Sequence, residues 1–263
     1  EPYTLEKGQI IFHHPNVFHN FRTDGAPDAE DGADCDIFVV SFNGELEMLE
    51  QFRDHIFTLS MHERHLFREM IEEGIDAIIL SPVDWEAITP SLQELKEAGV
   101  RIINADTQVK EMDYIDVYIG SDNYKAGAIC GEDLLERCPD GGKVALLECP
   151  TQNSINERIT GFEETLATAE KGFEVVARED TGGEFERALD ASEKILKENP
   201  DIVAIMCGND QLAVGATTAA NVAGLDEIVI YGVDGSPDIK KELKKPGTQV
   251  AGTAAQSPIS IGK

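Results

Sequence analysis

The feature that most constrains the fold is a regular alternation of short apolar runs with helical patterns, which begins at Ile75 and continues along the chain. The runs are dominated by Val, Ile, Leu and Ala, which is typical of strands buried on both faces of a parallel sheet. They occupy residues 75–80, 100–105, 116–120, 143–148, 173–178, 202–207, 227–232 and 249–254.

Helical patterns fill the intervals between these runs. They occupy residues 85–99, 124–138, 155–171, 185–199, 211–224 and 237–246. Strand, helix and strand at this spacing require right-handed crossovers, so the sequence predicts an open α/β fold with helices flanking parallel sheets. Ligands of such sheets bind at the carboxyl ends of the strands.

The first part of the chain has a different texture. All six histidines lie before residue 66, and short strand-like runs there are broken by turn signals such as GAPDAEDGAD. We therefore place a boundary near Glu73 and Gly74, between a β-rich segment over residues 1–73 and the alternating part.

Charge and apolar content exclude several classes of partner. Lys and Arg total 22 against 50 Asp and Glu, a formal net charge of −28, which repels nucleic acid and anionic lipid surfaces. No apolar run approaches the roughly 20 residues that a membrane helix needs, and no signal segment opens the chain. We expect a cytoplasmic protein or the mature form of a secreted one.

The cysteines and histidines give little support to a metal or a cofactor. Five cysteines, an odd number without C-x-x-C spacing, are interpreted as buried small residues. His13, His14 and His19 are an alternative metal set, but a strand places His13 and His14 on opposite faces, so at most one of them could join His19. We predict neither a metal ion nor a cofactor.

Polar residues follow four of the predicted strands. Asn209 and Asp210 come after 202–207, Asp234 follows 227–232, Asp106 follows 100–105, and Ser81 and Asp84 follow 75–80. Polar residues at so many strand ends exceed what helix capping requires, so they predict a ligand site. We expect Asp210 to cap its helix and Asn209 to face the ligand.

Five stretches carry a resemblance to a known family. They are YIGSDN, NSINERITGF, GNDQLAVG, IYGVDGSPD and AAQSP, and in this order and spacing they resemble the type I periplasmic binding proteins for sugars, the ribose and galactose group related to LacI-type repressors, over about residues 70–263. The resemblance implies two α/β lobes with a sugar held between them. It assigns 74–122 and 250–263 to a partial first lobe with its crossing segment, and 123–249 to the second lobe.

The same resemblance implies which residues bind the sugar. It suggests Asn209 and Asp234 from the second lobe, Gln256 from a crossing segment, and Asp106 and Ser81 from the first lobe. Asn156 falls where ribose-type members carry an arginine, which leaves the identity of the sugar open. Planar carboxylate and amide groups suit vicinal sugar hydroxyls, since each hydroxyl both donates and accepts. Trp85, the single tryptophan, either stacks on the sugar or packs at the start of a helix.

The front segment has a resemblance of its own. EPYTLEKGQIIFHHPNVFHNF, DIFVVSFNG and FTLSMHERHLFREMIEEG look like the cupin-like sensor half of AraC-type regulators, over residues 1–73. That resemblance implies a small effector, without the DNA-binding half of the regulator.

Enzyme motifs are absent from the sequence. It holds no phosphate-binding loop, G-x-G-x-x-G or G-x-S-x-G, and a nucleophile after residue 65 would have no histidine in its own part of the chain. We predict a sugar receptor that works with a membrane permease or a chemoreceptor, in the periplasm or outside the cell. The alternatives are an effector-sensing module of a regulator, which would also form dimers and be cytoplasmic, and a chimera that binds nothing.

Overall fold

The computed structural model describes residues 9–11, 56–58 and 63–257. Contacts divide the chain into two compact units, and residues Ile75–Ser257 make up the larger one. Outside it, β1 (Gln9–Ile11) pairs antiparallel with β2 (Ile56–Thr58), and α2 (Glu63–Glu72) follows. The histidines His13, His14 and His19 and most of the segment expected to resemble a cupin lie outside the described residues.

The larger unit contains two parallel sheets, as the apolar runs predicted. The smaller sheet has the order β3 (Ala77–Leu80), β4 (Arg101–Ala105) and β5 (Val117–Ile119). The larger has the order β10-β9-β8-β6-β7, with β6 at Gly142–Glu148, β7 at Phe173–Asp180, β8 at Ile202–Cys207, β9 at Val229–Asp234 and β10 at Val250–Ala255. Residues 250–255, which the family resemblance assigned with the first lobe, form this edge strand and pair in parallel with β9. The predicted α/β class is confirmed.

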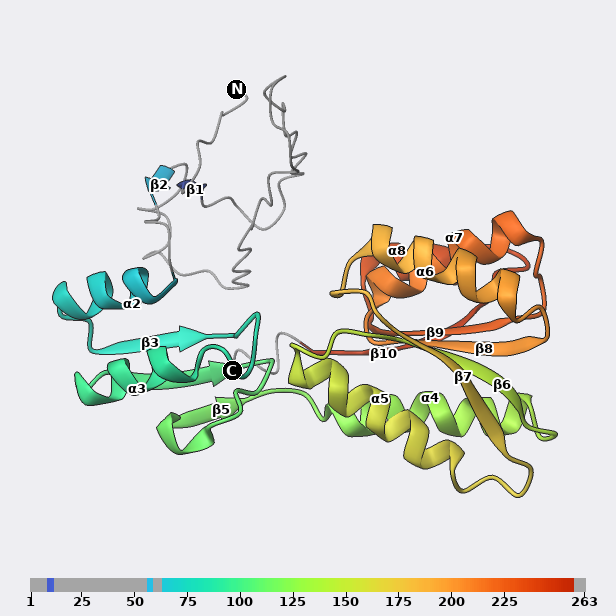
Figure 1. The fold of residues 1–263 in the computed structure, drawn as a ribbon, viewed down its shortest axis with the longest axis horizontal. Helices are drawn as coiled ribbons and strands as arrows, with labels where there is room; N and C mark the ends of the chain where they lie inside the picture. The colour runs from blue at the N-terminus through green and yellow to red at the C-terminus, as the bar shows by residue number, and fades with distance from the viewer. Residues whose placement is uncertain (1–8, 12–55, 59–62, 258–263) are drawn as a thin grey trace. The chain divides into compact units, whose positions relative to one another are not determined.

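Helices cover the larger sheet on both faces (Figure 1). On one face lie α4 (Asn123–Arg137) and α5 (Asn153–Leu166); on the other lie α6 (Phe185–Glu198), α7 (Asp210–Ala223) and α8 (Pro237–Glu242). Successive residues of a strand point to opposite faces. Accordingly Leu146 packs in the core beneath α4 and α5, whereas Leu147 packs beneath α6 and α7.

Two glycines allow α4 and α5 to lie in close contact. A Cβ on Gly127 would overlap the backbone carbonyl of Arg158, and a Cβ on Gly161 would overlap the carbonyl of Tyr124. Each glycine therefore sits where one helix backbone meets the other. Because Arg158 lies on α5, this contact helps to set its position along the sheet.

The helix predicted over 85–99 is shorter than expected. It is α3 (Thr89–Glu97), and the residues before it form turns. The carboxylate of Asp84 accepts hydrogen bonds of 2.9 Å from the backbone amides of Glu86 and Ala87, which holds this stretch in a turn. Pro90 at the first turn then suits the helix start. Between β4 and β5 lies the 3-10 helix η1 (Met112–Tyr114).

Candidate functional site

The polar residues predicted from strand ends lie at the carboxyl ends of the strands that they follow. Asp106 follows β4, Asn209 follows β8, Asp234 ends β9 and Gln256 follows β10. Parallel strands bring their carboxyl ends to one edge of a sheet, so Asn209, Asp234 and Gln256 belong to the same edge of the larger sheet.

Asp234 and Gln256 are in direct contact. The side-chain amide of Gln256 donates through Nε2 to Oδ1 of Asp234 at 2.8 Å, and its backbone amide donates to the carbonyl of Asp234 at 3.1 Å. The hydroxyl of Ser121 donates to Oε1 of Gln256 at 3.0 Å. Ser121 lies on the segment that leads from β5 to α4, so this chain of hydrogen bonds links the site to a connection between the two sheets.

Arg158 faces the same carboxylate from α5. Its side chain is only 4% exposed, and Nη1 lies 3.3 Å from Oδ1 of Asp234. Nη1 also donates to the carbonyl of Gly208 at 2.7 Å, and Nε donates to Oδ1 of Asn123 at 2.9 Å. This arginine was not among the site residues predicted from the sequence. A signal was available: Arg158 occupies the buried face of α5 together with Ile155, Ile159 and Phe162, where a charged residue is rare.

Opposing effects act on the carboxyl group of Asp234. Burial raises its pKa, while the guanidinium of Arg158 and the hydrogen bond from Gln256 lower it, and the nearby charges of Asp210 and Asp106 raise it. The net result is a pKa above the usual value. The residue also has a φ of 130°, a conformation that side chains seldom adopt and that is found at functional sites.

Asp106 has an unsatisfied oxygen. Its Oδ1 is buried and has no hydrogen-bond partner among the described residues, and its φ of 65° is left-handed. The backbone is held in place, because its amide donates to the carbonyl of Ile119 at 2.9 Å and its carbonyl accepts from the hydroxyl of Tyr118 at 2.9 Å. A buried acceptor without a donor is costly, so this oxygen suits a ligand that brings a donor.

The expectation that Asp210 caps α7 is corrected by the structure. Asn209 is the cap of α7, since its Oδ1 accepts from the amide of Leu212 at 3.0 Å, and its Nδ2 donates to the carbonyl of Gly183 at 3.2 Å. Asp210 is buried and accepts hydrogen bonds of 2.6 Å from the amide of Ser236 and the hydroxyl of Thr253. Asn209 is in the extended conformation that caps require, whereas Asp210 already lies inside the helix and points toward β9 and β10.

The remaining predicted residues lie in separate surroundings. Asn156 is partly exposed and donates to the carbonyl of Pro150 at 3.0 Å, and Ser81 is exposed. Trp85 precedes α3 rather than starting it, and the ammonium group of Lys110 lies 5.7 Å from the centre of its ring. The ring therefore has a cation against it. Asp234 and Gln256 are in direct contact, and the charge of Asp106 acts on the carboxyl group of Asp234.

The loop after β4 is tied to the region around the start of α5. The hydroxyls of Thr107 and Ser154 lie 2.9 Å apart and are buried, and the amide of Trp85 donates to the carbonyl of Thr151 at 2.9 Å. Asn153 also donates to Oε1 of Gln108 at 3.5 Å. The contacts of Thr107 and Gln108 hold the segment that carries Asp106 against the start of α5.

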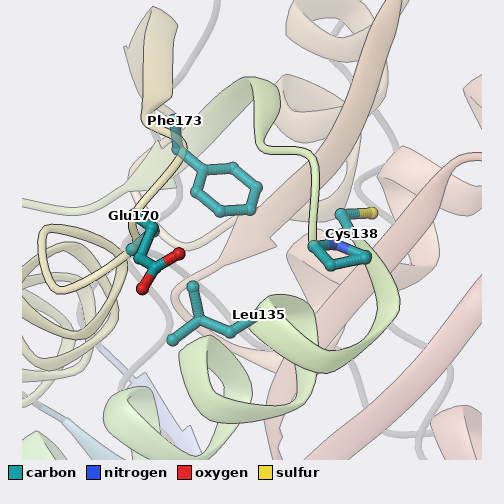
Figure 2. A pocket seen from close by; sticks show the side chains of 6 residues that line it. Leu135, Cys138, Glu170 and Phe173 are labelled. Atoms are coloured by element: carbon teal, nitrogen blue, oxygen red, sulfur yellow. The ribbon is translucent and has the colours of Figure 1, made fainter.

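A cavity of about 220 Å³ lies away from these residues. Figure 2 shows residues that line it: Leu135 and Cys138 at the end of α4, and Glu170 and Phe173, which lie just before and at the start of β7. Since β7 begins there, the cavity is at the amino ends of the strands, away from the edge that carries Asp234. None of the predicted site residues lines it.

Metal binding and membrane insertion find no support in residues 63–257 and the two short strands. Within that part of the chain, no group of three or more His, Cys, Asp or Glu side chains is arranged to hold a metal ion. Its helices are also too short or too polar to cross a membrane.

Comparison with known proteins gives a consistent result. Residues 63–263 match the family model described as periplasmic binding protein domain. The ribose import binding protein of Bacillus subtilis (strain 168) is 31% identical over 196 residues, which cover 74% of this chain and 62% of that protein. The D-ribose/D-allose-binding protein of Pseudomonas aeruginosa is 31% identical over 68% of this chain and 58% of its own length. The chain thus spans about 60% of the length of these relatives.

Solved structures agree with the sequence relatives. An ABC transporter periplasmic solute binding protein from Actinobacillus succinogenes 130z with bound D-allose has a TM-score of 0.66 and 32% identity, over 76% of this chain and 72% of that one. The Caulobacter myo-inositol binding protein, bound to myo-inositol, has a TM-score of 0.70 and 26% identity, over 75% and 68% of the two chains. The expected likeness of residues 1–73 to an AraC-type sensor is not supported: the family match takes in residues 63–73, and most of the segment before them lies outside the described residues.

Proposed function

The chain belongs to the periplasmic binding protein domain family, and from this premise we propose that it binds a monosaccharide or a similar small polyol without transforming it. Relatives named for ribose, allose and myo-inositol support this class of ligand. The family consists of binding proteins rather than catalysts, so no residue is assigned a catalytic role.

The observation that carries the proposal is the unpaired oxygen of Asp106. A sugar hydroxyl would donate to this buried acceptor, which has no partner among the described residues. Asp234 and Gln256 supply further planar polar groups at the edge of the larger sheet. Asn209 is a weaker candidate for ligand contact, because its side-chain oxygen already caps α7 and its side-chain nitrogen already donates to Gly183.

The charge of the site favours neutral sugars. The carboxylates of Asp106 and Asp234 lie close enough to affect each other, and Arg158, the arginine beside Asp234, already donates to Gly208 and Asn123. An acidic sugar or a sugar phosphate would add a negative charge to this excess. We therefore expect the site to discriminate against uronic acids and phosphorylated sugars.

We further propose that the protein delivers its sugar to a membrane permease. The relatives include import proteins and a periplasmic solute binding protein of an ABC transporter. We accordingly place the mature protein in the periplasm or outside the cell. A chemoreceptor partner and a dimer stay predictions of the sequence.

A thermal-shift screen tests the proposed function. The panel contains D-ribose, D-allose, D-fructose and myo-inositol, with glucuronic acid and ribose 5-phosphate as charged controls. A ligand at a hundred times its Kd adds about 2.7 kcal/mol to the free energy of unfolding. We expect such a shift with at least one neutral compound in the wild type and none in Asp234→Ala. Equal shifts in both proteins, or none with any neutral sugar, would contradict the proposal.

A further inference from the structure

We propose that Arg158 is a positioning residue for the sugar site, which holds the carboxylate of Asp234 so that its Oδ2 oxygen faces the ligand. This inference rests on the proposed function, because it assigns a role within the same site. Arg158 acts through Asp234 and does not itself contact the sugar.

The first step is the way in which Arg158 is fixed. Its guanidinium donates hydrogen bonds to Asn123 at the start of α4 and to Gly208 just after β8, and it forms an ion pair with Asp234 at the end of β9. Three elements therefore hold one buried side chain, which leaves it a single orientation. A guanidinium presents its donors in a rigid planar fork, so it can satisfy these partners together where a lysine ammonium could not.

The second step is the asymmetry of the Asp234 carboxylate. Arg158 approaches Oδ1 at 3.3 Å and Gln256 donates to the same oxygen at 2.8 Å. Among the described residues, no donor reaches Oδ2, and the side chain of Asp234 is 38% exposed. One oxygen is thus used by the protein, and the other is left to accept from a ligand hydroxyl.

The third step is the charge around that carboxylate. Asp210 on α7 and Asp106 after β4 are the acidic neighbours, Gln256 is neutral, and Arg158 on α5 is the cation. Burial and the two acidic neighbours favour the protonated carboxyl group, and Arg158 favours the ionised form. Loss of Arg158 would therefore move the pKa of Asp234 further upward and weaken a site that needs the charged acceptor.

A purely structural role for Arg158 predicts a different outcome. Arg158 also joins α4 to the loop after β8, and any change there would lower stability. A structural role would not, however, move the pH at which the sugar is released. The pH profile of binding therefore separates positioning from simple packing.

The test compares Arg158→Gln and Arg158→Lys with the wild type by titration calorimetry between pH 5 and 8, using the neutral sugar found in the screen. Removing the ion pair with Asp234 should weaken binding about tenfold to a hundredfold at pH 7 in Arg158→Gln. The loss of affinity on acidification should begin at a higher pH than in the wild type. Arg158→Lys loses the planar guanidinium, so it should weaken binding. It keeps the positive charge, so its pH profile should stay near that of the wild type.

Arg178→Gln is the matched control. Arg178 is an arginine on β7 that pairs with Glu148 and Glu163, away from Asp234. Its replacement should leave both the affinity and the pH profile unchanged. Wild-type affinity and pH profile in Arg158→Gln would overturn the inference while leaving the proposed function intact.

A second measurement does not depend on any sugar. The 13C signal of the Asp234 carboxyl group, assigned with Asp234→Asn, is followed against pH in the ligand-free full chain. Its pKa should rise in Arg158→Gln and stay near the wild-type value in Arg158→Lys and Arg178→Gln. If Arg158→Gln does not fold, Arg158→Lys is also made in the Asp234→Asn background: a loss of affinity that appears only when Asp234 is present supports the inference, and an equal loss in both backgrounds overturns it. Failure of the wild type to bind any sugar would contradict the proposed function, whereas an unchanged carboxyl pKa in Arg158→Gln would contradict the role of Arg158.

Discussion

Gln256 donates its side-chain amide to Oδ1 of Asp234 at 2.8 Å while its own carbonyl oxygen accepts from Ser121 at 3.0 Å. One side chain therefore joins a proposed ligand group to the segment that leads from the smaller sheet into α4. Any movement of that segment would change the surroundings of the carboxylate.

Replacing Gln256 by Ala should weaken sugar binding more than replacing Ser121 by Ala. Gln256→Ala removes the bond to Asp234 and the bond to Ser121, each of which contributes roughly 0.5–1.5 kcal/mol. Ser121→Ala removes only the second. Calorimetry on both variants measures the difference, and equal losses would mean that the link to Ser121 carries the effect alone.

The stability of the ligand-free protein should depend on pH through Asp234. Its folded-state pKa is raised, so the folded chain holds this proton more tightly than the unfolded chain does. The free energy of unfolding should therefore fall as pH rises from the unfolded pKa, about 3.9, through the folded one.

The variant Asp234→Asn cannot titrate at this position and lacks that contribution. Its stability relative to the wild type should increase with pH, as measured by urea unfolding between pH 3.5 and 7. A stability difference that is constant across this range would argue against a raised pKa.

Asp210→Ala should destabilise the chain. The substitution leaves the amide of Ser236 and the hydroxyl of Thr253 without their buried acceptor, at a cost of about 1–3 kcal/mol for each unsatisfied group. Asn209→Ala, which removes the cap of α7, should cost about 1 kcal/mol. Urea unfolding checks both, with the exposed Asp238→Ala as a control that should change little.

The buried thiols should be unreactive in the folded protein. Burial is the main reason that the pKa of Cys130 is raised to about 12 and that the pKa of Cys207 is raised well above its usual value, so neither thiol is ionised at pH 8. Alkylation at pH 8 followed by peptide mapping should label both only after unfolding. Cys138, which is partly exposed, should react first of these three, and rapid labelling of Cys207 in the native state would contradict its burial.

The strands were predictable because their burial on two faces produces continuous apolar runs. The adjacent residues Leu146 and Leu147 pack into the cores on opposite faces of the larger sheet, so both positions are apolar. The carboxyl ends of such strands then indicate where a ligand site lies, which is how Asp106 and Asp234 were predicted, whereas Gln256 was predicted from the family resemblance. The start of α3 was less predictable, since the turn around Asp84 depends on hydrogen bonds that compete with the helix.

Two features of the site could not be obtained from local sequence. Which of Asn209 and Asp210 caps α7 depends on the backbone angles at the helix entrance, and both residue types are good caps. Arg158 acquires its role only when α4, β8 and β9 come together around it. Tertiary contacts decide both cases.

The glycines at the contact of α4 and α5 restrict how such a receptor could be redesigned. Gly127 meets the backbone of Arg158 itself, so even a methyl group there would push α5 away from its neighbour. A library that randomises residues around the ligand to change sugar preference should therefore hold Gly127 and Gly161 constant. Variation at either glycine would alter selectivity from a distance, and a screen would wrongly credit the change to the residues lining the site.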